Sequence, residues 1–405
     1  MKKIHAPAGE STAARRKFIR DVALLGGAAA SGAIWPSVSQ AQAAKLRIGL
    51  MLPYTGTYAT LGVAITNGFK LAVTESGGKL GGREIEYFTV DDESDPAKGP
   101  ENANKLVQRD KVDILVGTVH SGVVMGMVKV ARDTGTLLVI PNAGAGAATG
   151  AMCAPNIFRT SFTNWQPCYP MGKVMYEKGH RTAVTFTHKY AAGDEMVGGF
   201  KDGFEKAGGK VVKEMSLPFP GVEFQAFITE IAALKPDAVF AFFAGAAAVK
   251  FVKDYAAAGL KSKIPLYGPG FLTDGTLDAQ GDAAQGMLTT LHYGDGIETA
   301  RNNAFRLAYA KTFKLQPDVY AVQGYDAGLL LAAGLKATKG DVANKTALIT
   351  AMEKAPIDSP RGKWIMSKAH NPVQDIYLRQ VVGKENKVIG VAWKALADPA
   401  LGCKM

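Results

Sequence analysis

From residue 44 onward, short β-rich apolar runs alternate with longer segments whose apolar residues recur at helical spacing. A strand is expected over Leu46–Leu52, followed by a Pro53-Tyr54-Thr55-Gly56 turn and a helix over about 58–75. The same order recurs, with strands over 84–90, 112–116 and 137–140 and helices over 96–109 and 122–132. Strands separated by helices predict parallel βαβ crossovers.

A second array of the same kind begins after about residue 170. Its strands are expected over 183–187, 210–215, 238–243 and 264–267, and its helices over 195–207, 224–234 and 246–258. The chain then becomes mostly helical, over 299–313, 320–337 and 345–354, and ends in short strands over 362–365, 376–382 and 388–392. Two arrays, a helical block and a strand tail predict two α/β lobes between which the chain crosses more than once.

The first 43 residues have the order of an export signal: a basic region, a mild apolar run over 22–35, and Ala41-Gln42-Ala43. Arg15-Arg16, followed by Lys17-Phe18-Ile19-Arg20, is similar to a twin-arginine signal. We expect cleavage after Ala43 and a periplasmic protein. A permanent anchor is disfavoured because the apolar run is shorter than the roughly 20 residues that cross a bilayer.

Composition and charge limit the classes of function that are open to the chain. The chain has 405 residues, 47% hydrophobic and 20% charged, which suits a globular protein with two cores. Without the first 43 residues, which hold six basic and two acidic side chains, the formal net charge falls from +11 to +7. The remaining charge is dispersed and no basic block is interleaved with aromatic residues, so nucleic-acid binding is disfavoured.

Three cysteines are present in a protein predicted to reach an oxidising compartment. Cys153 and Cys168 are close enough in sequence to close a loop of about 16 residues, which in the loop-entropy model stabilises by roughly 3 kcal/mol. A Cys153–Cys168 disulfide is therefore expected, with Cys403 left over; the alternative is that Cys153 and Cys168 are two unpaired thiols. Their spacing matches no structural zinc pattern.

Several short motifs occur in a characteristic order. They are Leu52-Pro53-Tyr54-Thr55-Gly56, the pairs Gly77-Gly78 and Gly81-Gly82, Asp91-Asp92-Glu93-Ser94-Asp95-Pro96, Val116-Gly117 with His120-Ser121, and Ile140-Pro141-Asn142-Ala143. With this order and spacing the chain resembles the leucine/isoleucine/valine-type (type I) periplasmic binding proteins of ABC importers. The resemblance implies an α/β fold of two Rossmann-like lobes with parallel sheets joined by three hinge crossovers.

The resemblance also implies how the chain is divided and what it does. Lobe 1 would comprise 44–162 and 292–368, and lobe 2 would comprise 163–291 and 369–405. A small organic ligand would bind between the lobes, whose closure presents a surface to the ABC permease at the inner membrane. The protein would be a monomer, without cofactor, metal or enzymatic activity.

The predicted ligand contacts follow the expected strands: Tyr58, His120, Ser121, Gly122, Asn142, Ala143, Gly144, Tyr190, Ala192, Ala244, Gly270 and Phe271. Residues 120–122 open a helix, where backbone N–H groups and the helix dipole favour a carboxylate. The resemblance implies that Tyr190 covers the ligand side chain. Alternative roles are a surface aromatic for Tyr58, an ordinary helix cap for Ser121 and a core position for Phe271.

Departures from the family pattern bear on the ligand. Gly270 stands where amino-acid binders carry the acidic residue that holds the ammonium, unless Asp274 or Asp295 replaces it, and Val123 and Gly144 replace hydroxyl-bearing residues. With Tyr190, Phe271 and Trp165 expected near the cleft, an aromatic or other apolar acid is favoured, and a branched-chain amino acid or amide comes next.

Two other classes of function compete with transport. A secreted enzyme is disfavoured because the sequence has no GxSxG or HExxH motif, and Asp91-Asp92-Glu93 is more typical of a structural turn than of a metal site. A ligand sensor that signals to a receptor instead of a permease remains open, since both functions use the same closure.

Overall fold

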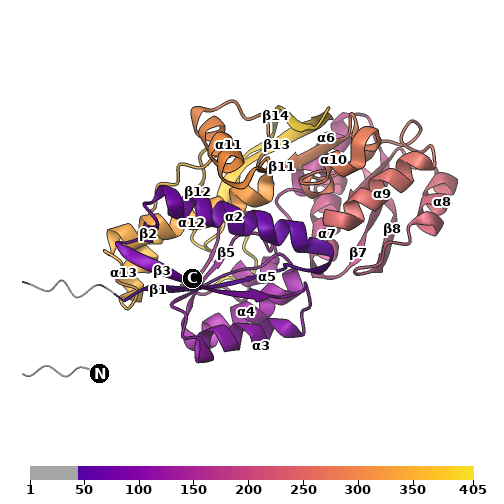
Figure 1. The fold of residues 1–405 in the computed structure, drawn as a ribbon. Helices are drawn as coiled ribbons and strands as arrows, with labels where there is room; N and C mark the ends of the chain where they lie inside the picture. Colours follow the sequence, from indigo (N-terminus) through magenta and orange to yellow (C-terminus); the bar gives the residue numbers. More distant parts are fainter. Residues whose placement is uncertain (1–43) are drawn as a thin grey trace, which may run out of the picture. The chain divides into compact units, whose positions relative to one another are not determined.

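The computed structural model describes residues 44–405, in which two β-sheets are each covered by helices on both faces (Figure 1). The predicted signal segment and its cleavage site lie outside the described residues. The two α/β lobes confirm the predicted fold class.

The first sheet contains six strands that are parallel apart from one edge hairpin. In spatial order they are β2 (Lys79–Leu80), β3 (Arg83–Asp91), β1 (Leu46–Leu52), β4 (Ile114–Gly117), β5 (Leu137–Ile140) and β6 (Ile157–Arg159). The central strands are buried apolar runs, as expected for a parallel sheet covered on both faces.

Successive residues of β1 supply both faces of this sheet. Leu46, Ile48 and Leu50 pack with α2 (Ala59–Glu75), α12 (Val319–Ala337) and α13 (Lys345–Glu353) on one face. Met51 packs on the other face with α3 (Lys98–Asn104), its continuation η2 (Lys105–Arg109) and α4 (Ser121–Thr134). The alternation follows from the two-residue period of a strand.

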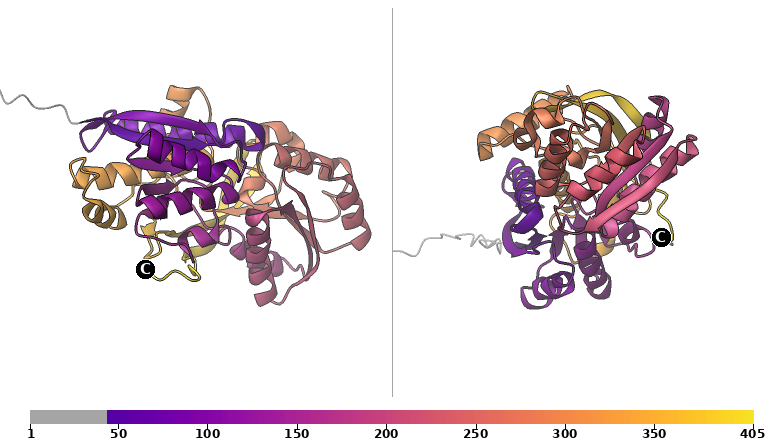
Figure 2. Two further views of the ribbon diagram at one scale, coloured as in Figure 1. Left: turned by 90° about the horizontal axis from the view of Figure 1, so that it is seen from below. Right: turned by 90° about the vertical axis from the view of Figure 1, so that its right-hand side faces the viewer.

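Helices α2 and α12 lie side by side although they are far apart in sequence (Figures 1 and 2). A Cβ atom at Gly68 would lie 1.9 Å from the carbonyl oxygen of Ala321, and one at Gly324 would lie 1.9 Å from that of Ile65. Only glycine permits this approach, which brings the start of α12 against the middle of α2. Helix α11 (Ala300–Phe313) also packs against α2.

The second sheet is mixed. In spatial order its strands are β12 (Ile365–Met366), β13 (Pro372–Val382), β11 (Leu288–Leu291), β10 (Leu266–Pro269), β9 (Ala238–Phe242), β7 (Thr182–Lys189) and β8 (Lys210–Pro218), and β14 (Glu385–Leu396) pairs with β13. Strands β11 to β8 are parallel, whereas β13 runs antiparallel to its neighbours. Helices α6 (Tyr169–Glu177) and α7 (Ala191–Lys206) cover one face, and α8 (Gln225–Leu234) and α9 (Gly245–Ala257) cover the other.

The predicted elements are largely confirmed. Strands β1 and β5 have the predicted ends, and α11 and α13 differ by one residue at one end. The sequence reading missed β6, β11 and α6, as well as the short elements α5 (Gly146–Thr149) and α10 (Leu277–Gln280). The lobe boundaries near residues 162, 291 and 368 stay predictions.

The predicted Cys153–Cys168 disulfide is wrong, because the structure joins Cys153 to Cys403. Cys168 is a free, buried thiol at the start of α6. The C-terminal segment returns to the first lobe, where Gly402 lies beside Ala151. Sequence proximity favoured the short loop, but the path of the tail determines the partner.

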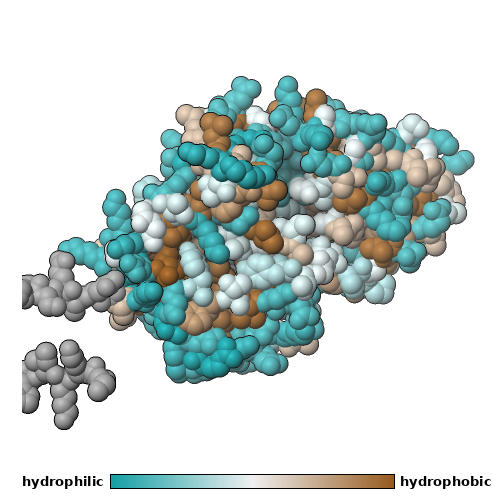
Figure 3. Space-filling view, in the orientation of Figure 1, coloured by the Kyte–Doolittle hydropathy of each residue, from teal (hydrophilic) through white to brown (hydrophobic). Residues whose placement is uncertain are grey.

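None of the helices within residues 44–405 is long and apolar enough to cross a membrane. On the face drawn in Figure 3, hydrophobic residues occur in small groups among hydrophilic ones. Most large apolar side chains of the described residues are instead gathered in the cores of the two lobes and between them.

The disulfide assignment predicts one reactive thiol when the unreduced protein is unfolded in denaturant, namely Cys168. Alkylation with a mass-tagged reagent followed by peptide mapping will place the label on the peptide that contains Cys168. A label on Cys403 would instead indicate the short-loop pairing. Full reduction before unfolding is the control and exposes all three thiols.

Candidate functional site

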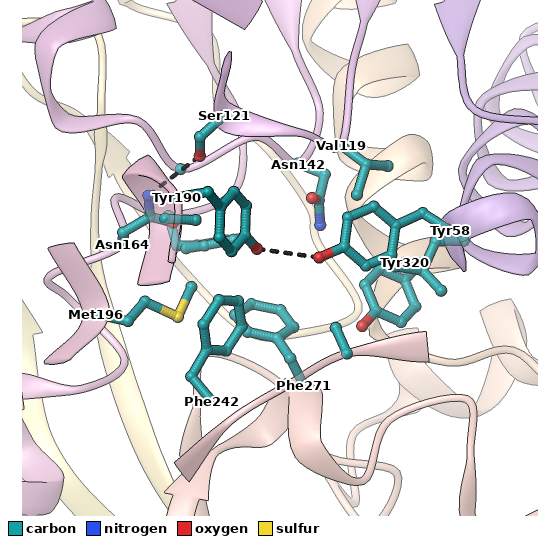
Figure 4. Close-up of a pocket in the computed structure, with 15 residues that line it drawn as sticks. Tyr58, Val119, Ser121, Asn142, Asn164, Tyr190, Met196, Phe242, Phe271 and Tyr320 are labelled. Atoms are coloured by element: carbon teal, nitrogen blue, oxygen red, sulfur yellow. Dashed lines mark hydrogen bonds between the residues drawn. The ribbon is translucent and has the colours of Figure 1, made fainter. Parts of the chain in front are cut away.

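A pocket lies where the carboxyl ends of the parallel strands of the two sheets face each other (Figure 4). Its lining encloses about 320 Å³ of empty space, part of it open to solvent. The lining residues are Tyr58, Leu61, Val119, Ser121, Asn142, Gly144, Phe162, Asn164, Tyr190, Ala192, Met196, Phe242, Ala244, Phe271 and Tyr320. This location is typical of ligand sites in open α/β folds.

Two tyrosines span the pocket from opposite sheets. Tyr58 ends the short helix η1 (Gly56–Tyr58) after β1, and Tyr190 follows β7. Their hydroxyl oxygens lie 3.0 Å apart and share a hydrogen bond across the pocket (Figure 4). Burial raises the pKa of Tyr58 to about 12 and that of Tyr190 well above its ordinary value, so both hydroxyls stay protonated.

Aromatic rings form much of the remaining wall. Phe271, on η3 (Gly270–Leu272) after β10, has its ring centre 4.7 Å from that of Phe162 and 6.3 Å from that of Phe242. Tyr190 packs on Phe242 at 6.3 Å. The ring faces and edges suit a flat apolar ligand, since aromatic pairs are stable in tilted and offset arrangements.

A polar contact between the lobes lies beside these rings. The Asn164 amide nitrogen donates to Glu195 Oε2 on α7 at 2.7 Å and to Ser121 Oγ on α4 at 3.2 Å. Glu195 also accepts from the backbone N–H of Gly146 at 3.0 Å. Because Ser121 Oγ accepts in this network, its own hydroxyl proton remains available to a ligand.

Asn142 begins a buried chain of amides that leads away from the pocket. Its Nδ2 donates to Gln323 Oε1 at 2.6 Å, so the amide nitrogen of Gln323 faces His292 Nε2 at 3.3 Å. One N–H of the Asn142 amide is thereby fixed, and the second is left for the pocket. This series of hydrogen bonds, which includes Gln323 on α12, sets the orientation of the Asn142 amide.

Most of the predicted contact residues lie in the pocket. The structure brings together Tyr58, Ser121, Asn142, Gly144, Tyr190, Ala192, Ala244 and Phe271. Their role in holding a ligand stays a prediction. Ser121 follows the cap residue instead of being the cap, because the N-cap of α4 is His120.

Predicted residues 120, 122, 143 and 270 do not line the pocket. His120 Nδ1 accepts from the Gly122 N–H at 3.1 Å, so that N–H is already paired. The Ala143 N–H donates to the Thr118 carbonyl. A Cβ at Gly270 would lie 2.1 Å from the Arg379 guanidinium, so a side chain there would require the buried Arg379 to move.

The acids suggested as substitutes at Gly270 are already paired. Asp274 Oδ2 lies 2.7 Å from the buried Arg379 Nη2, and Asp295 pairs with Arg306 at 3.1 Å. Trp165, also expected near the ligand, stacks on Tyr169 and does not line the pocket.

Several lining residues escaped the sequence reading: Leu61, Val119, Phe162, Asn164, Met196, Phe242 and Tyr320. Phe162 and Asn164 lie in the segment between β6 and α6, where the sequence has no clear periodicity. For Tyr320 the sequence does contain a signal, because Asp318 is a typical N-cap residue and marks the helix start beside which Tyr320 lies. In the structure Asp318 caps α12 and accepts the Ala321 N–H at 2.9 Å.

No Asp, Glu, Lys, Arg or His stands among the described residues that line the pocket. Within residues 44–405, no group of three or more His, Cys, Asp or Glu side chains is placed to hold a metal ion. Asp91 and Asp92 instead accept the backbone N–H groups of Glu93 and Ser94, each two residues further along, as turn residues do. The site can therefore bind a small molecule through neutral donors and rings.

Comparisons with known proteins agree with this architecture. A family model described as periplasmic binding protein matches residues 45–386. The chain is 30% identical over 357 residues to Leu/Ile/Val-binding protein homolog 6 of Brucella melitensis biotype 1, covering 85% of this chain and 90% of that one.

Two solved structures are also similar to it. A solute-binding protein of an ABC transporter from R. palustris, in complex with benzoate, is 54% identical with a TM-score of 0.87, covering 89% of this chain and 100% of that one. Another, from Rhodopseudomonas palustris BisB5 in complex with 3,4-dihydroxy benzoic acid, is 32% identical with a TM-score of 0.83, covering 88% and 99%.

His120, the cap residue of α4, predicts that the free energy of unfolding depends on pH. Burial lowers the pKa of His120 to about 4, against 6.5 in the unfolded chain, so the unfolded state takes up its proton first as the pH falls. Between pH 6.5 and 4, His120 should thus cost the native state up to about 3 kcal/mol of unfolding free energy. His120→Asn keeps a capping side chain and removes this titration.

Urea unfolding of wild type and His120→Asn at pH 7 and pH 4 measures this effect. Burial raises the pKa of Asp92 and Asp274 to about 6, which favours the native state on acidification, but both proteins share that contribution. The wild type should lose more stability than the variant. An equal loss in both would show that His120 does not titrate as inferred.

Proposed function

The chain belongs to the periplasmic binding protein family, and from that premise we propose that it captures a benzoate-type aromatic carboxylate and delivers it to an ABC permease. It is a binding protein and not an enzyme, and the family implies an exported, periplasmic protein. Export through a twin-arginine signal cleaved after Ala43 is part of the proposal.

The observation that carries the ligand class is a ring-lined pocket without a charged side chain among its described residues. A benzoate ring would lie among Tyr190, Phe242 and Phe271, with its carboxylate toward Ser121 and Asn142. There the hydroxyl of Ser121, the second amide N–H of Asn142 and the N-terminus of α4 supply donors and a favourable dipole.

The pocket is poorly suited to an α-amino acid. An ammonium group brought out of water needs an anionic partner, and none of the described residues that line the pocket is acidic. The space beside Gly270 is filled by the guanidinium of Arg379. This guanidinium is paired with Asp274, so neither group offers a free negative charge to an ammonium. The similarity to benzoate-bound and dihydroxybenzoate-bound solute-binding proteins supports the same ligand class.

Closure would use contacts between the two sheets' helices. Tyr58 and Tyr190 meet over the ligand space, and Glu195 on α7 ties Asn164 to Gly146, the first residue of α5. A ligand that contacts both sides would favour the closed form by its differential affinity for that state. The closed surface is what a permease would recognise.

Thermal unfolding and titration calorimetry with benzoate, benzamide and leucine test the proposal. Benzoate at 100 times its Kd should raise the free energy of unfolding by about 2.7 kcal/mol. Benzamide has a similar shape but no negative charge, and should bind more weakly because the donors lose their anionic acceptor. Stabilisation by leucine with none by benzoate would contradict the proposal.

A further inference from the structure

One hydroxyl in the pocket has no partner. The Tyr320 side chain is 1% exposed, and its hydroxyl oxygen makes no hydrogen bond within the described residues. The hydroxyls of Tyr58 and Tyr190 are paired with each other, and Ser121 Oγ accepts from Asn164. A buried hydroxyl without a partner is unfavourable, so the Tyr320 hydroxyl is a candidate for pairing with a ligand group.

Tyr320 lies on the side of the pocket away from Ser121 and Asn164 (Figure 4). Its ring stacks near Phe271 at 6.1 Å, and a Cβ at Gly275 would lie 3.7 Å from the ring edge. The Tyr320 ring therefore packs against the segment that follows β10. Ser121 instead lies at the end of the pocket that is formed by α4 and α7. A ligand that spans the pocket reaches both ends.

The chemistry of the Tyr320 hydroxyl limits what it can pair with. Burial, followed by the nearby carboxylates of Asp274 and Asp318, raises its pKa well above the ordinary value, so it remains a neutral donor and acceptor. A second carboxylate at this end would be repelled by those acids, which are only partly offset by Arg379. A neutral hydroxyl group can both donate to and accept from Tyr320.

We propose that Tyr320 pairs with a hydroxyl on the ligand ring opposite the carboxylate, so that the preferred ligand is a ring-hydroxylated benzoate. This inference rests on the proposed function, because it assumes a benzoate carboxylate at the Ser121 end. It assigns Tyr320 as the residue that distinguishes hydroxylated from unsubstituted rings.

Titration calorimetry with benzoate, 4-hydroxybenzoate and 4-methylbenzoate tests the inference, since the hydroxyl and methyl groups are similar in size. The wild type should bind 4-hydroxybenzoate about tenfold more tightly than 4-methylbenzoate, as expected for one buried hydrogen bond. Tyr320→Phe should abolish that preference, because it removes the hydroxyl that pairs with the ligand. Tyr255→Phe, which removes a buried hydroxyl bonded to the Ile264 carbonyl outside the pocket, is the control and should keep the preference.

The outcomes separate the two claims. Benzoate binding without a preference for the hydroxyl in the wild type, or a preference that survives in Tyr320→Phe, overturns the inference and leaves the proposed function intact. Absence of binding by all three acids overturns both. If Tyr320→Phe does not fold, the wild-type ratio for the hydroxyl and methyl ligands still decides.

Discussion

A carboxylate that leaves water must find hydrogen-bond donors, and the pocket between the lobes offers them only from neutral groups. Ser121 and Asn142 are held in orientation by Asn164 and by the amide of Gln323, and the N-terminus of α4 adds its dipole. Because no charged side chain lines the pocket within residues 44–405, the selectivity of the site must come from ring packing and from the position of these few polar atoms.

A buried ion pair lies behind the pocket. Arg379 is enclosed by the second sheet, where it pairs with Asp274 and donates to the Tyr293 carbonyl at 2.8 Å. Its guanidinium occupies the space that any side chain at Gly270 would need. Arg379 and Asp274 pair with each other inside the lobe, and neither is among the described residues that line the pocket.

Aromatic side chains join the two lobes through the pocket. One apolar cluster includes Tyr58 and Leu61 from the first lobe, Phe242 and Phe271 from the second, and Tyr320 from α12. Close packing of α12 on α2, permitted by Gly68 and Gly324, brings Tyr320 to this cluster. Ligand recognition and lobe packing therefore use the same side chains.

Local patterns predicted much of this architecture. The runs Leu46–Leu52 and Leu137–Ile140 are buried strands whose hydrophobicity is visible in the sequence. Ser121 and Tyr190 entered the predicted site through their positions just after strands together with the family resemblance. The remainder depends on tertiary structure. Phe162 reaches the pocket from an irregular segment, and the partner of Cys153 follows from the path of the C-terminal tail.

A crystal structure of the protein with bound benzoate tests the central claim most directly. The account predicts the ring among Tyr190, Phe242 and Phe271, with its carboxylate within hydrogen-bond distance of Ser121 and Asn142. A second cavity lies on the far side of the second lobe, beside Tyr255, Lys261 and Met287. Benzoate bound only there, next to a lysine and outside the space between the lobes, would contradict the account.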